Sequence, residues 1–529
     1  MENQGSQDLA SAIGTLDWVV IAVYFGAIIA IGVWVARRTD SGEDLFLAGR
    51  GLTWGIIGFS LFASNISSTT LIGLTGAAYS TGISVSAYEW MAGVPLLLMA
   101  LVFAPLFIKS RITTIPEYLE LRYNRKSRLY FSAVTILLTI IVDTAGGLYA
   151  GAVVTRAFLP DVPIWIICVA IGIFAGLYTA AGGLRAVVLT DVMQAVVLIA
   201  GTFAMTMILF SMNDWSWSSV QNNVPDQQLS IVQPLDDEIL PWPGLILGVP
   251  ILGFWYWVTN QYIVQRVLGA KTLRDAQGGT ILAGFLKILP MFIMVLPGAM
   301  AVSVLPELSN PDQVFPTLVA EILPVGLTGL VLAGLVAAIM SSVDSTLNSA
   351  STLVVHDFVR NENRDLDSET TRKYGRATTL ILMLVAIVWA PLIAQAGGLW
   401  EYLQQAFSIL VPPVAAVFLL GAFWRRATAT GAFTALIAGH AVALTTFVLT
   451  VLDIWPLHYT INIGLMTVVS MAILVGVSLA TEPTEKERLD RTVWRPSEAV
   501  TDGTWPFSMV LTASGLLVVA MAAILVLFW

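Results

Sequence analysis

The chain has 529 residues, of which 57% are hydrophobic and 12% are charged, and its mean hydropathy is +0.81. This composition excludes an ordinary soluble globular protein. The net charge of −9 argues against a nucleic-acid partner. The single cysteine, Cys168, excludes an intramolecular disulfide and a cysteine-based metal site. We therefore expect an integral membrane protein surrounded by the lipid bilayer.

Apolar runs long enough to cross a bilayer recur along the whole chain. A helix needs roughly 20 residues to cross a hydrocarbon core of ~30 Å. No soluble domain separates the runs, so the sequence predicts an all-α integral membrane protein with a single membrane domain covering 1–529. About fourteen runs can be drawn, near 18–36, 53–79, 87–108, 130–157, 164–181, 186–212, 241–260, 276–306, 326–350, 376–396, 402–422, 429–452, 460–480 and 507–528.

The basic residues are distributed unevenly between the connections of these runs. Of the 26 Lys and Arg residues, 24 lie in every second connection, and the other two are Arg156, in an opposite connection, and Lys287, inside a predicted span. Basic residues stay on the cytoplasmic side during insertion. We therefore expect a multi-pass protein of the cell (inner) membrane with both termini outside the cytoplasm. The first run follows Asp17 and precedes Arg37, the reverse of a secretory signal peptide, which favours a retained span.

Two of the runs contain residues that interrupt a helix. The second run holds the polar stretch 63–70 in its middle, and the seventh holds Gly244, Gly248, Pro250 and Gly253 in its first half. Irregular backbone at membrane depth is tolerated only where it is buried in protein or lines a cavity. A matched pair of broken helices five spans apart is typical of an inverted repeat with a substrate site between them. Ordinary packing of small residues between helices is the alternative.

A few ionisable residues fall inside predicted spans, where burial of a charge is costly and a functional role is the default expectation. The alternatives are a structural ion pair between helices and a side chain that reaches the interface. For Asp191, near the inner end of its span, the choice lies between an interfacial acid and a carboxylate that holds a cation on its way to the cytoplasm. The residues concerned are Glu89, Asp143, Asp191, Lys287 and Asp344.

A cluster of serines in the ninth run favours a sodium site. Ser341 and Ser345 share one face of a helix, and Ser342 lies beside them. Small hydroxyls together with carbonyls freed by a broken helix form a neutral oxygen cage, which suits Na⁺ better than Ca²⁺ or Mg²⁺. Serines that only pack helices together are the alternative.

The polar and aromatic residues near the broken helices suggest a neutral ligand rich in hydroxyls. Hydrogen-bonding side chains combined with flat aromatic faces are the usual means of holding a polyol ring. The alternatives are polar residues that join helices and aromatic residues that pack or anchor at the interface. No phosphate-binding glycine-rich loop and no nucleophile–base constellation occurs, so we expect a non-enzymatic protein without a cofactor. The candidates are Asn65, Thr70, Glu89, Lys287 and Gln404 for hydrogen bonding, and Tyr256, Trp257 and Trp400 for stacking.

Several motifs resemble the sodium/solute symporter family, most closely its sodium/glucose cotransporter branch. Together they are highly specific, and the similarity runs from Phe46-Leu47-Ala48-Gly49-Arg50 to the last span. The motifs are Leu61-Phe62-Ala63-Ser64-Asn65-Ile66, Tyr88-Glu89-Trp90, Gly182-Gly183-Leu184-Arg185-Ala186-Val187 with Thr190-Asp191, Leu240-Pro241-Trp242-Pro243-Gly244, Trp255-Tyr256-Trp257 with Gln265-Arg266, Phe285-Leu286-Lys287 and Ala338-Ile339-Met340-Ser341-Ser342.

The resemblance implies a LeuT-like five-plus-five inverted repeat that works by alternating access, driven by the inward Na⁺ gradient. One helix precedes the repeats and three follow them. In this sequence the leading helix falls within 1–40, the two repeats within 53–212 and 241–422, and the C-terminal helices within 429–529.

The resemblance also assigns roles to individual residues. The coupling ion would be held by the carbonyls of Ala63, Ile66 and Ala338 and the hydroxyls of Ser341 and Ser342, and Asp191 with Ser345 matches a second cation position of some members. Sugar-contacting positions correspond to Asn65, Glu89, Lys287 and Gln404. Tyr256 resembles the inner gate, backed by Trp257, and Trp400 resembles the outer lid.

Three positions depart from the known galactose-binding patterns. Thr70 replaces a Gln or His, Asp143 replaces an Asn, and Gly253 replaces an Asn or Thr. The expected function is Na⁺-coupled symport of a monosaccharide, a glucose- or galactose-like sugar. The alternatives are a symporter of the same fold for an inositol, an amino acid, a sialic acid or a carboxylate, and, from another class, a membrane sensor or a facilitator.

Overall fold

The structure, a computed structural model, describes residues 14–36, 47–159, 161–237, 239–305, 308, 311–359, 367–395, 399–452, 454–500 and 505–529. Within these ranges the chain is helical, and β-type pairing is limited to two isolated bridges, Leu52 with Ala270 and Gln233 with Pro241. The predicted all-α class is therefore confirmed for the described part of the chain.

The predicted spans are all found as helical segments. Among the described residues, eleven helices are long and apolar enough to cross a membrane, and a bent pair formed by Trp54–Asn65 and Thr70–Thr81 makes up to twelve. The two remaining runs contain shorter apolar helices, Thr15–Ile31 and Ile164–Leu177. The count of fourteen crossings and the repeat layout stay predictions.

The first half of the chain supplies the following elements: α2 (Thr15–Ala36), α4 (Trp54–Asn65), α5 (Ser68–Thr81), α6 (Ala87–Trp90), α7 (Gly93–Leu98), η3 (Met99–Phe103), α8 (Ala104–Lys109), α9 (Ile115–Arg122), α10 (Arg125–Leu138), η4 (Thr139–Thr144), α11 (Ala145–Phe158), α12 (Ile164–Met212) and α13 (Trp217–Asn223).

The second half supplies α14 (Trp242–Phe254), η6 (Trp255–Thr259), α15 (Gln261–Leu268), α16 (Leu273–Leu286), η7 (Met291–Val295), α17 (Leu296–Ala301), α18 (Val314–Ile322), α19 (Leu327–Leu353), η9 (Val354–Val359), α20 (Ser368–Trp389), α21 (Leu399–Phe423), α22 (Ala429–Val451), α23 (Tyr459–Ala480), α24 (Lys486–Thr492) and α25 (Phe507–Leu527).

The second predicted span is broken, as its polar middle predicts. Helices α4 and α5 meet at an angle of 59°. Between them Ile66 is extended, with φ −77° and ψ 91°, and the Ser67 hydroxyl caps α5 by accepting a hydrogen bond from the backbone N–H of Thr70. The break therefore leaves carbonyl groups at the end of α4 outside a regular helix, since a helix terminus cannot satisfy its last carbonyls internally.

The seventh span is also broken, but not in the glycine-rich half where the sequence predicts the interruption. Helix α14 runs through Pro250 to Phe254, and the chain breaks at Asn260, whose ψ is 120°. The glycines serve close packing: a Cβ on Gly244 would stand 1.9 Å from the Thr460 hydroxyl, and one on Gly248 would stand 2.3 Å from the Thr460 carbonyl oxygen. The backbone of α14 thus lies directly against the start of α23.

Helix α12 differs from the expectation as well. Its 49 residues form one helical element that joins the predicted runs 164–181 and 186–212, where a connection was expected around Arg185. The Gly182-Gly183 pair therefore lies inside helical backbone.

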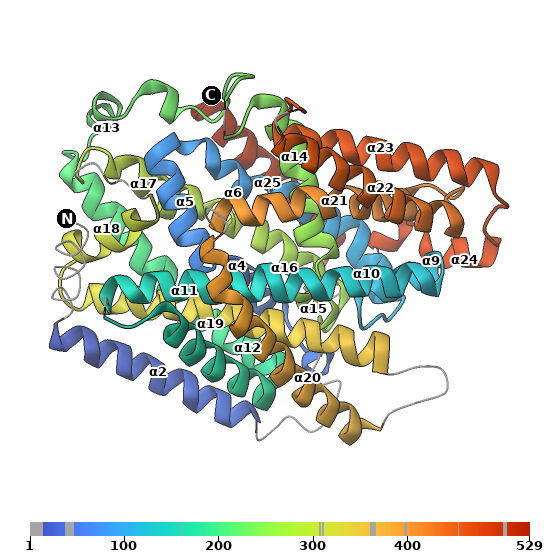
Figure 1. Cartoon of the computed structure of the whole chain (residues 1–529), viewed down its shortest axis with the longest axis horizontal. Helices are drawn as coiled ribbons and strands as arrows, with labels where there is room; N and C mark the ends of the chain where they lie inside the picture. The colour runs from blue at the N-terminus through green and yellow to red at the C-terminus, as the bar shows by residue number, and fades with distance from the viewer. Residues whose placement is uncertain are drawn as a thin grey trace.

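The leading helix is fixed to the helix that bears the serine cluster. Helix α2 contacts α12 and α19 and lies along one edge of the molecule (Figure 1). The buried carboxylate of Asp17 accepts hydrogen bonds from the backbone N–H groups of Gly326 at 2.7 Å and Gly329 at 2.6 Å, at the start of α19. An acceptor in this position satisfies donors that a helix N-terminus leaves unpaired.

The C-terminal helices α22 and α23 lie side by side at one end of the molecule, next to α21 (Figure 1). Toward the middle of the bundle, α4 packs against α16 and α12, and α19 contacts α4, α5, α11 and α15. The two broken helices and α19 therefore meet in the core.

Candidate functional site

Two cavities lie where the broken helices meet. The larger, about 150 Å³, is bordered by polar groups, and the smaller, about 110 Å³, is mainly aromatic and aliphatic. Asn65, Tyr256 and Phe407 line both, so these three side chains separate the two spaces. The larger cavity is also lined by Ser64, Ser67, Thr70, Glu89, Val142, Asp143, Gly147, Tyr262, Ser342 and Thr346, and the smaller one by Tyr88, Val249, Leu252, Gly253, Trp255 and Trp257.

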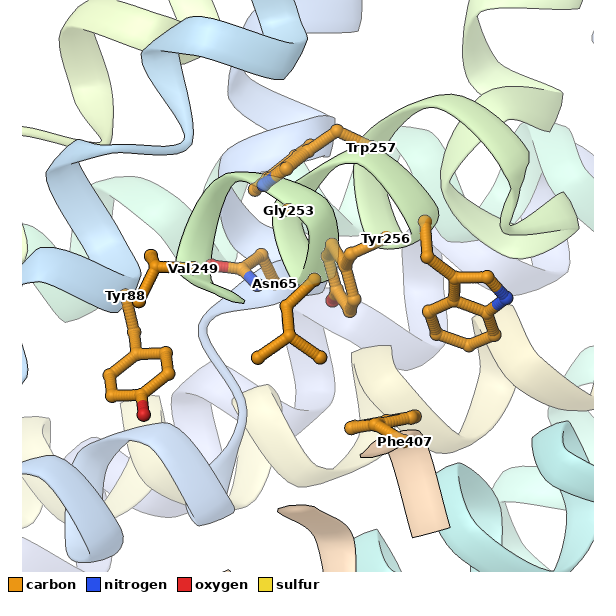
Figure 2. A pocket seen from close by; sticks show the side chains of 9 residues that line it. Asn65, Tyr88, Val249, Gly253, Tyr256, Trp257 and Phe407 are labelled. Carbon is orange, nitrogen blue, oxygen red and sulfur yellow. The ribbon is translucent and has the colours of Figure 1, made fainter. Parts of the chain in front are cut away.

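The smaller cavity is shown in Figure 2. Asn65 and Tyr256 stand near each other at its centre, Phe407 lies on the opposite side, and Tyr88 closes one end. Trp257 and Tyr256 lie on opposite sides of the helical segment that carries them both. The two rings form an edge-to-face pair with centroids 5.1 Å apart.

The two charged candidates, Glu89 on α6 and Lys287 at the C-terminal cap of α16, form a buried ion pair beside Asn65. The Lys287 ammonium donates hydrogen bonds to the carboxylate of Glu89 and to the side-chain oxygen of Asn65. The side chain of Lys287 is 1% exposed and that of Glu89 is 7% exposed. Lys287 also lies 5.7 Å from the centroid of the Trp257 ring. The structure thus brings together four of the residues proposed to bind substrate.

The residues on either side of the seventh-span break are linked across it. The Tyr262 hydroxyl on α15 donates a 2.6 Å hydrogen bond to the Tyr256 hydroxyl on η6. Tyr256 borders both cavities and Tyr262 borders the larger one. This pair therefore forms a wall of the larger cavity next to the break at Asn260.

Thr70 and Asp143 both reach the larger cavity. The Thr70 hydroxyl donates a hydrogen bond of 3.0 Å to the Asn65 carbonyl and thereby holds one of the backbone groups at the α4–α5 break. The Oδ2 atom of Asp143 is buried without a hydrogen-bond partner among the described residues. Gly253 lines the smaller cavity, so the third departure noted in the sequence also falls at this site.

The side chains of two candidate residues, Trp400 and Gln404, lie outside the described part of the structure, although their backbone belongs to α21. Phe407, one turn after Gln404 on the same helix, borders both cavities.

The candidate sodium ligands lie on the α4–α5 break and on α19, which contact each other. The Ser342 hydroxyl borders the larger cavity and donates a 3.0 Å hydrogen bond to the Ala338 carbonyl. The Ser341 hydroxyl instead donates to the carboxylate of Asp191. Ala63 and Ile66 lie at the end of α4 and in the break. No cluster of three or more His, Cys, Asp or Glu side chains forms among the described residues.

Asp191 is deep in the protein and not at an interface. Its exposed fraction is 0%, and its carboxylate accepts hydrogen bonds from Ser60 at 2.6 Å and Ser64 at 3.0 Å, in addition to Ser341. It forms an ion pair of 2.9 Å with Arg266, whose side chain is also 0% exposed. The interpretation of Asp191 as an interfacial acid does not agree with this burial.

Arg266 is the functional candidate that the sequence reasoning missed. The predicted seventh run ends at residue 260, so Arg266 falls in the connection that follows it and reads as one of the basic residues of that connection. The extension of that span by α15 places Arg266 in the core. The burial that reveals its role extends over the whole of α15 and is visible only in the structure.

A polar cavity at two broken helices, buried inside a bundle of apolar helices, defines a membrane transport protein. Comparison with known proteins agrees with this class. Residues 45–439 match the sodium:solute symporter family. The Homo sapiens sodium/myo-inositol cotransporter 2 is 34% identical over 531 residues, covering 90% of this chain and 78% of that protein. The Oryctolagus cuniculus sodium/glucose cotransporter 1 is 33% identical over 535 residues, covering 90% and 81%.

Two solved structures share the fold. A Na⁺-coupled sialic acid symporter in a substrate-bound outward-open state superposes with a TM-score of 0.80 at 22% identity, covering 89% of this chain and 99% of that chain. The nucleobase-cation-symport-1 transporter Mhp1 in a closed conformation superposes with a TM-score of 0.56 at 16% identity, covering 84% and 97%. The chain belongs to the sodium:solute symporter family. It is a transport protein rather than an enzyme, with Na⁺ as the coupling ion implied by that family.

Proposed function

We propose that the chain couples the inward movement of Na⁺ to the uptake of a neutral polyol, a monosaccharide of the glucose or galactose kind, by alternating access. The observation that carries this proposal is the group formed by Lys287, Glu89 and Asn65 next to the larger cavity. A buried ammonium, a carboxylate and an amide offer both donors and acceptors to ring hydroxyls. The aromatic ring of Tyr256 adds a flat face against which a sugar ring can pack.

The charges around the cavity favour a neutral substrate. The ammonium of Lys287 is already neutralised by Glu89, and the guanidinium of Arg266 by Asp191. Asp143 adds a further acid to the lining. A sialic acid, an amino acid or another carboxylate would therefore meet acidic groups without an uncommitted cation among the described lining residues, which disfavours its binding. Asp143 and Thr70 would contact hydroxyl groups of the substrate.

A second candidate substrate is an inositol. One relative that is 34% identical over 90% of this chain is named a sodium/myo-inositol cotransporter. An inositol is also an uncharged six-membered ring with several hydroxyl groups, so the same donors and acceptors would serve it. The two candidates differ in the ring: a hexopyranose contains a ring oxygen and carries a hydroxymethyl group, whereas an inositol is an all-carbon ring with a hydroxyl on every carbon.

The coupling ion would bind where the α4–α5 break faces α19. The 59° bend frees carbonyls near Ala63 and Ile66, and α19 presents Ala338, Ser341 and Ser342 from a helix that contacts both α4 and α5. Neutral oxygen ligands of this kind suit Na⁺. Since Ser342 also lines the larger cavity, ion and substrate would lie close enough to influence each other.

The outer side of the substrate site would be closed by α21. Residues 400, 404 and 407 follow at intervals of four and three, which places them on one face of a helix. Because Phe407 lines both cavities, Gln404 would contact the substrate and Trp400 would cover it from one turn further away. Tyr256, backed by Trp257, would close the inner side.

The broader layout is proposed from the sequence pattern. Residues 53–212 and 241–422 form two inverted repeats, preceded by the helix within 1–40 and followed by the helices within 429–529. The protein lies in the cell (inner) membrane with both termini outside the cytoplasm, as the distribution of basic residues favours. A protease site added before residue 1 and cut from the outside of intact cells would test this orientation.

Uptake by the purified full-length protein in liposomes tests the function. Labelled glucose, galactose, myo-inositol, sialic acid and alanine are offered separately with an inward Na⁺ gradient, and again with K⁺ in place of Na⁺. We expect accumulation of a neutral polyol that requires Na⁺ and is competed by unlabelled polyols. Na⁺-driven uptake of sialic acid or alanine without uptake of any polyol would overturn the proposed substrate class. Polyol uptake that is equal in K⁺ would overturn sodium coupling.

A further inference from the structure

The carboxylate of Asp191 on α12 joins the three elements that surround it. Ser60 and Ser64 on α4, Ser341 on α19 and Arg266 on α15 all donate hydrogen bonds to it. Since Ser64 also lines the larger cavity and Asp191 is fully buried, this cluster lies directly beneath the cavity.

The guanidinium of Arg266 fills the space between Asp191 and Ser345. Its Nη2 donates to Asp191 at 2.9 Å, to Ser345 at 2.7 Å and to Ser64, and its Nε donates to Ser60 at 2.7 Å. Asp191 and Ser345 are the two residues that the family resemblance implies for a second cation. In this structure an internal cation of the protein already occupies their hydrogen-bonding positions.

Because of charge balance, the Arg266 guanidinium and a sodium ion cannot both be bound by Asp191 at the same time. One buried carboxylate is neutralised by one cation. A second cation beside it would bury an uncompensated positive charge, which costs several kcal/mol at membrane depth. Exchange of one cation for the other leaves the net charge of the cluster unchanged, so it avoids this cost.

Arg266 is connected to the wall of the substrate cavity. Its Nη1 donates to the Tyr262 carbonyl, and the Tyr262 hydroxyl donates to the Tyr256 hydroxyl at 2.6 Å. Arg266 and Tyr262 lie in α15, which follows the break at Asn260, and Tyr256 lies in η6, which precedes it. Further hydrogen bonds hold α15, among them one from Gln265 to Thr352 at 3.1 Å and one from the Ile115 N–H to Gln261 at 2.7 Å.

We propose that Arg266 is an internal competitor for the second cation position, and that a sodium ion bound by Asp191 and Ser345 displaces its guanidinium and releases α15 from α4, α12 and α19. Arg266 is therefore a positioning residue: it acts on the gate formed by Tyr256 and Tyr262 without contact with the substrate. This inference rests on the proposed sodium coupling, and it adds the step by which an ion loosens the inner half of the broken helix.

Two measurements on the purified full-length protein test the proposal without transport. The first is equilibrium binding of ²²Na⁺ in the absence of substrate. Removing an internal competitor removes the fraction of time for which the site is blocked, so Arg266→Gln should strengthen binding of the weaker sodium ion by about tenfold or more. In the same background Ser345→Ala should reverse part of the gain, and the charge-neutral pair Asp191→Asn with Arg266→Gln should lose that ion altogether.

The second measurement is hydrogen exchange of the backbone amides of α15 in the unaltered protein, with NaCl against choline chloride at equal ionic strength. Sodium should speed exchange in residues 261–268. This arm needs no variant and therefore holds even if Arg266→Gln does not fold. Unchanged or slower exchange in α15, or sodium binding by Arg266→Gln that is no tighter than in the parent, would show that the Asp191–Arg266 pair is purely structural.

A variant at the main ion position distinguishes failure of the proposed sodium coupling from failure of the proposed role of Arg266. Ser342→Ala should weaken the tighter sodium ion and leave the gain in Arg266→Gln intact. Complete absence of sodium binding in the parent would overturn the proposed coupling itself. One Ser342-dependent ion with no response to Arg266 would overturn only the role of Arg266.

Discussion

The hydroxyl of Tyr262 donates a 2.6 Å hydrogen bond to the hydroxyl of Tyr256 across the backbone break at Asn260. This bond joins α15 to η6 at the wall of the larger cavity, where we propose that the substrate binds. Because the two residues lie on opposite sides of the break at Asn260, the bond limits how far α15 can swing away from η6.

Tyr262→Phe should therefore ease inner opening. Loss of one neutral hydrogen bond is worth about 0.5–1.5 kcal/mol, or roughly two- to tenfold in the rate of substrate exchange. Tyr256→Phe should have the same effect, and the double variant no more than either single one. Counterflow of labelled substrate in liposomes measures this rate. Tyr130→Phe, which removes a 2.9 Å hydrogen bond to His440 elsewhere, is the control. Additive effects of the two single variants would contradict a shared bond.

Ser342→Ala should raise the sodium concentration needed for half-maximal uptake. Its hydroxyl bonds to the Ala338 carbonyl beside the cavity, and loss of a ligand of this strength costs on the order of 1–3 kcal/mol. Ser341→Ala should have a larger effect, because it also removes a donor to Asp191. Sodium titration of uptake at saturating substrate measures both. Ser349→Ala, a buried hydroxyl on the same helix, should leave the curve in place. An unchanged sodium dependence in both test variants would remove these serines from the site.

Glu89→Gln and Lys287→Ala should each abolish most polyol uptake, and each should also lower the melting temperature. Removal of one partner of a buried pair leaves the other charge uncompensated, at a cost of about 3–5 kcal/mol. The combined variant Glu89→Gln with Lys287→Met should regain stability without regaining uptake. Thermal unfolding in detergent and uptake in liposomes are measured together. Recovery of uptake in the double variant would show that the pair serves structure and not substrate binding.

Asp17→Ala should destabilise the protein by loss of the cap on α19. The carboxylate accepts hydrogen bonds from Gly14, Gly326 and Gly329, and loss of such a cap costs about 0.5–2 kcal/mol. Asp17→Asn keeps an acceptor oxygen and should lose less. The matched control is Asp367→Ala, which removes a cap on α20 from an exposed position. A melting temperature equal to the parent for Asp17→Ala would contradict the clamp between α2 and α19.

Much of the architecture follows from local sequence properties. Hydropathy indicates where the long apolar helices lie, because each of them must satisfy its own backbone in lipid. The break after Asn65 was predictable because a run of small polar residues sits inside an apolar segment. Glu89 and Lys287 were found because ionisable residues inside spans are rare.

Other features depend on contacts between distant segments. In the sequence, Gly244 and Gly248 suggest a break in the helix. In the structure they make room for the close approach of Thr460, which lies more than two hundred residues later in the chain. The true break at Asn260 lies between two stretches that both form helix, so hydropathy gives no signal there. Arg266 looks like an ordinary basic residue of a connection until Asp191 is seen to face it.

The contact between α14 and Thr460 also divides the molecule into parts that can and cannot move separately. At Gly248 the backbone of α14 lies directly against the backbone of Thr460, and at Gly244 it lies against the Thr460 side chain. Because this contact leaves no free space, a rotation of α14 would drive it into the first turn of α23. We therefore expect the part of the seventh span before the break to move together with α23. Independent movement of the seventh span would then fall to α15, the eight residues after Asn260, which are the part of this span that can change position without disturbing the contact with α23.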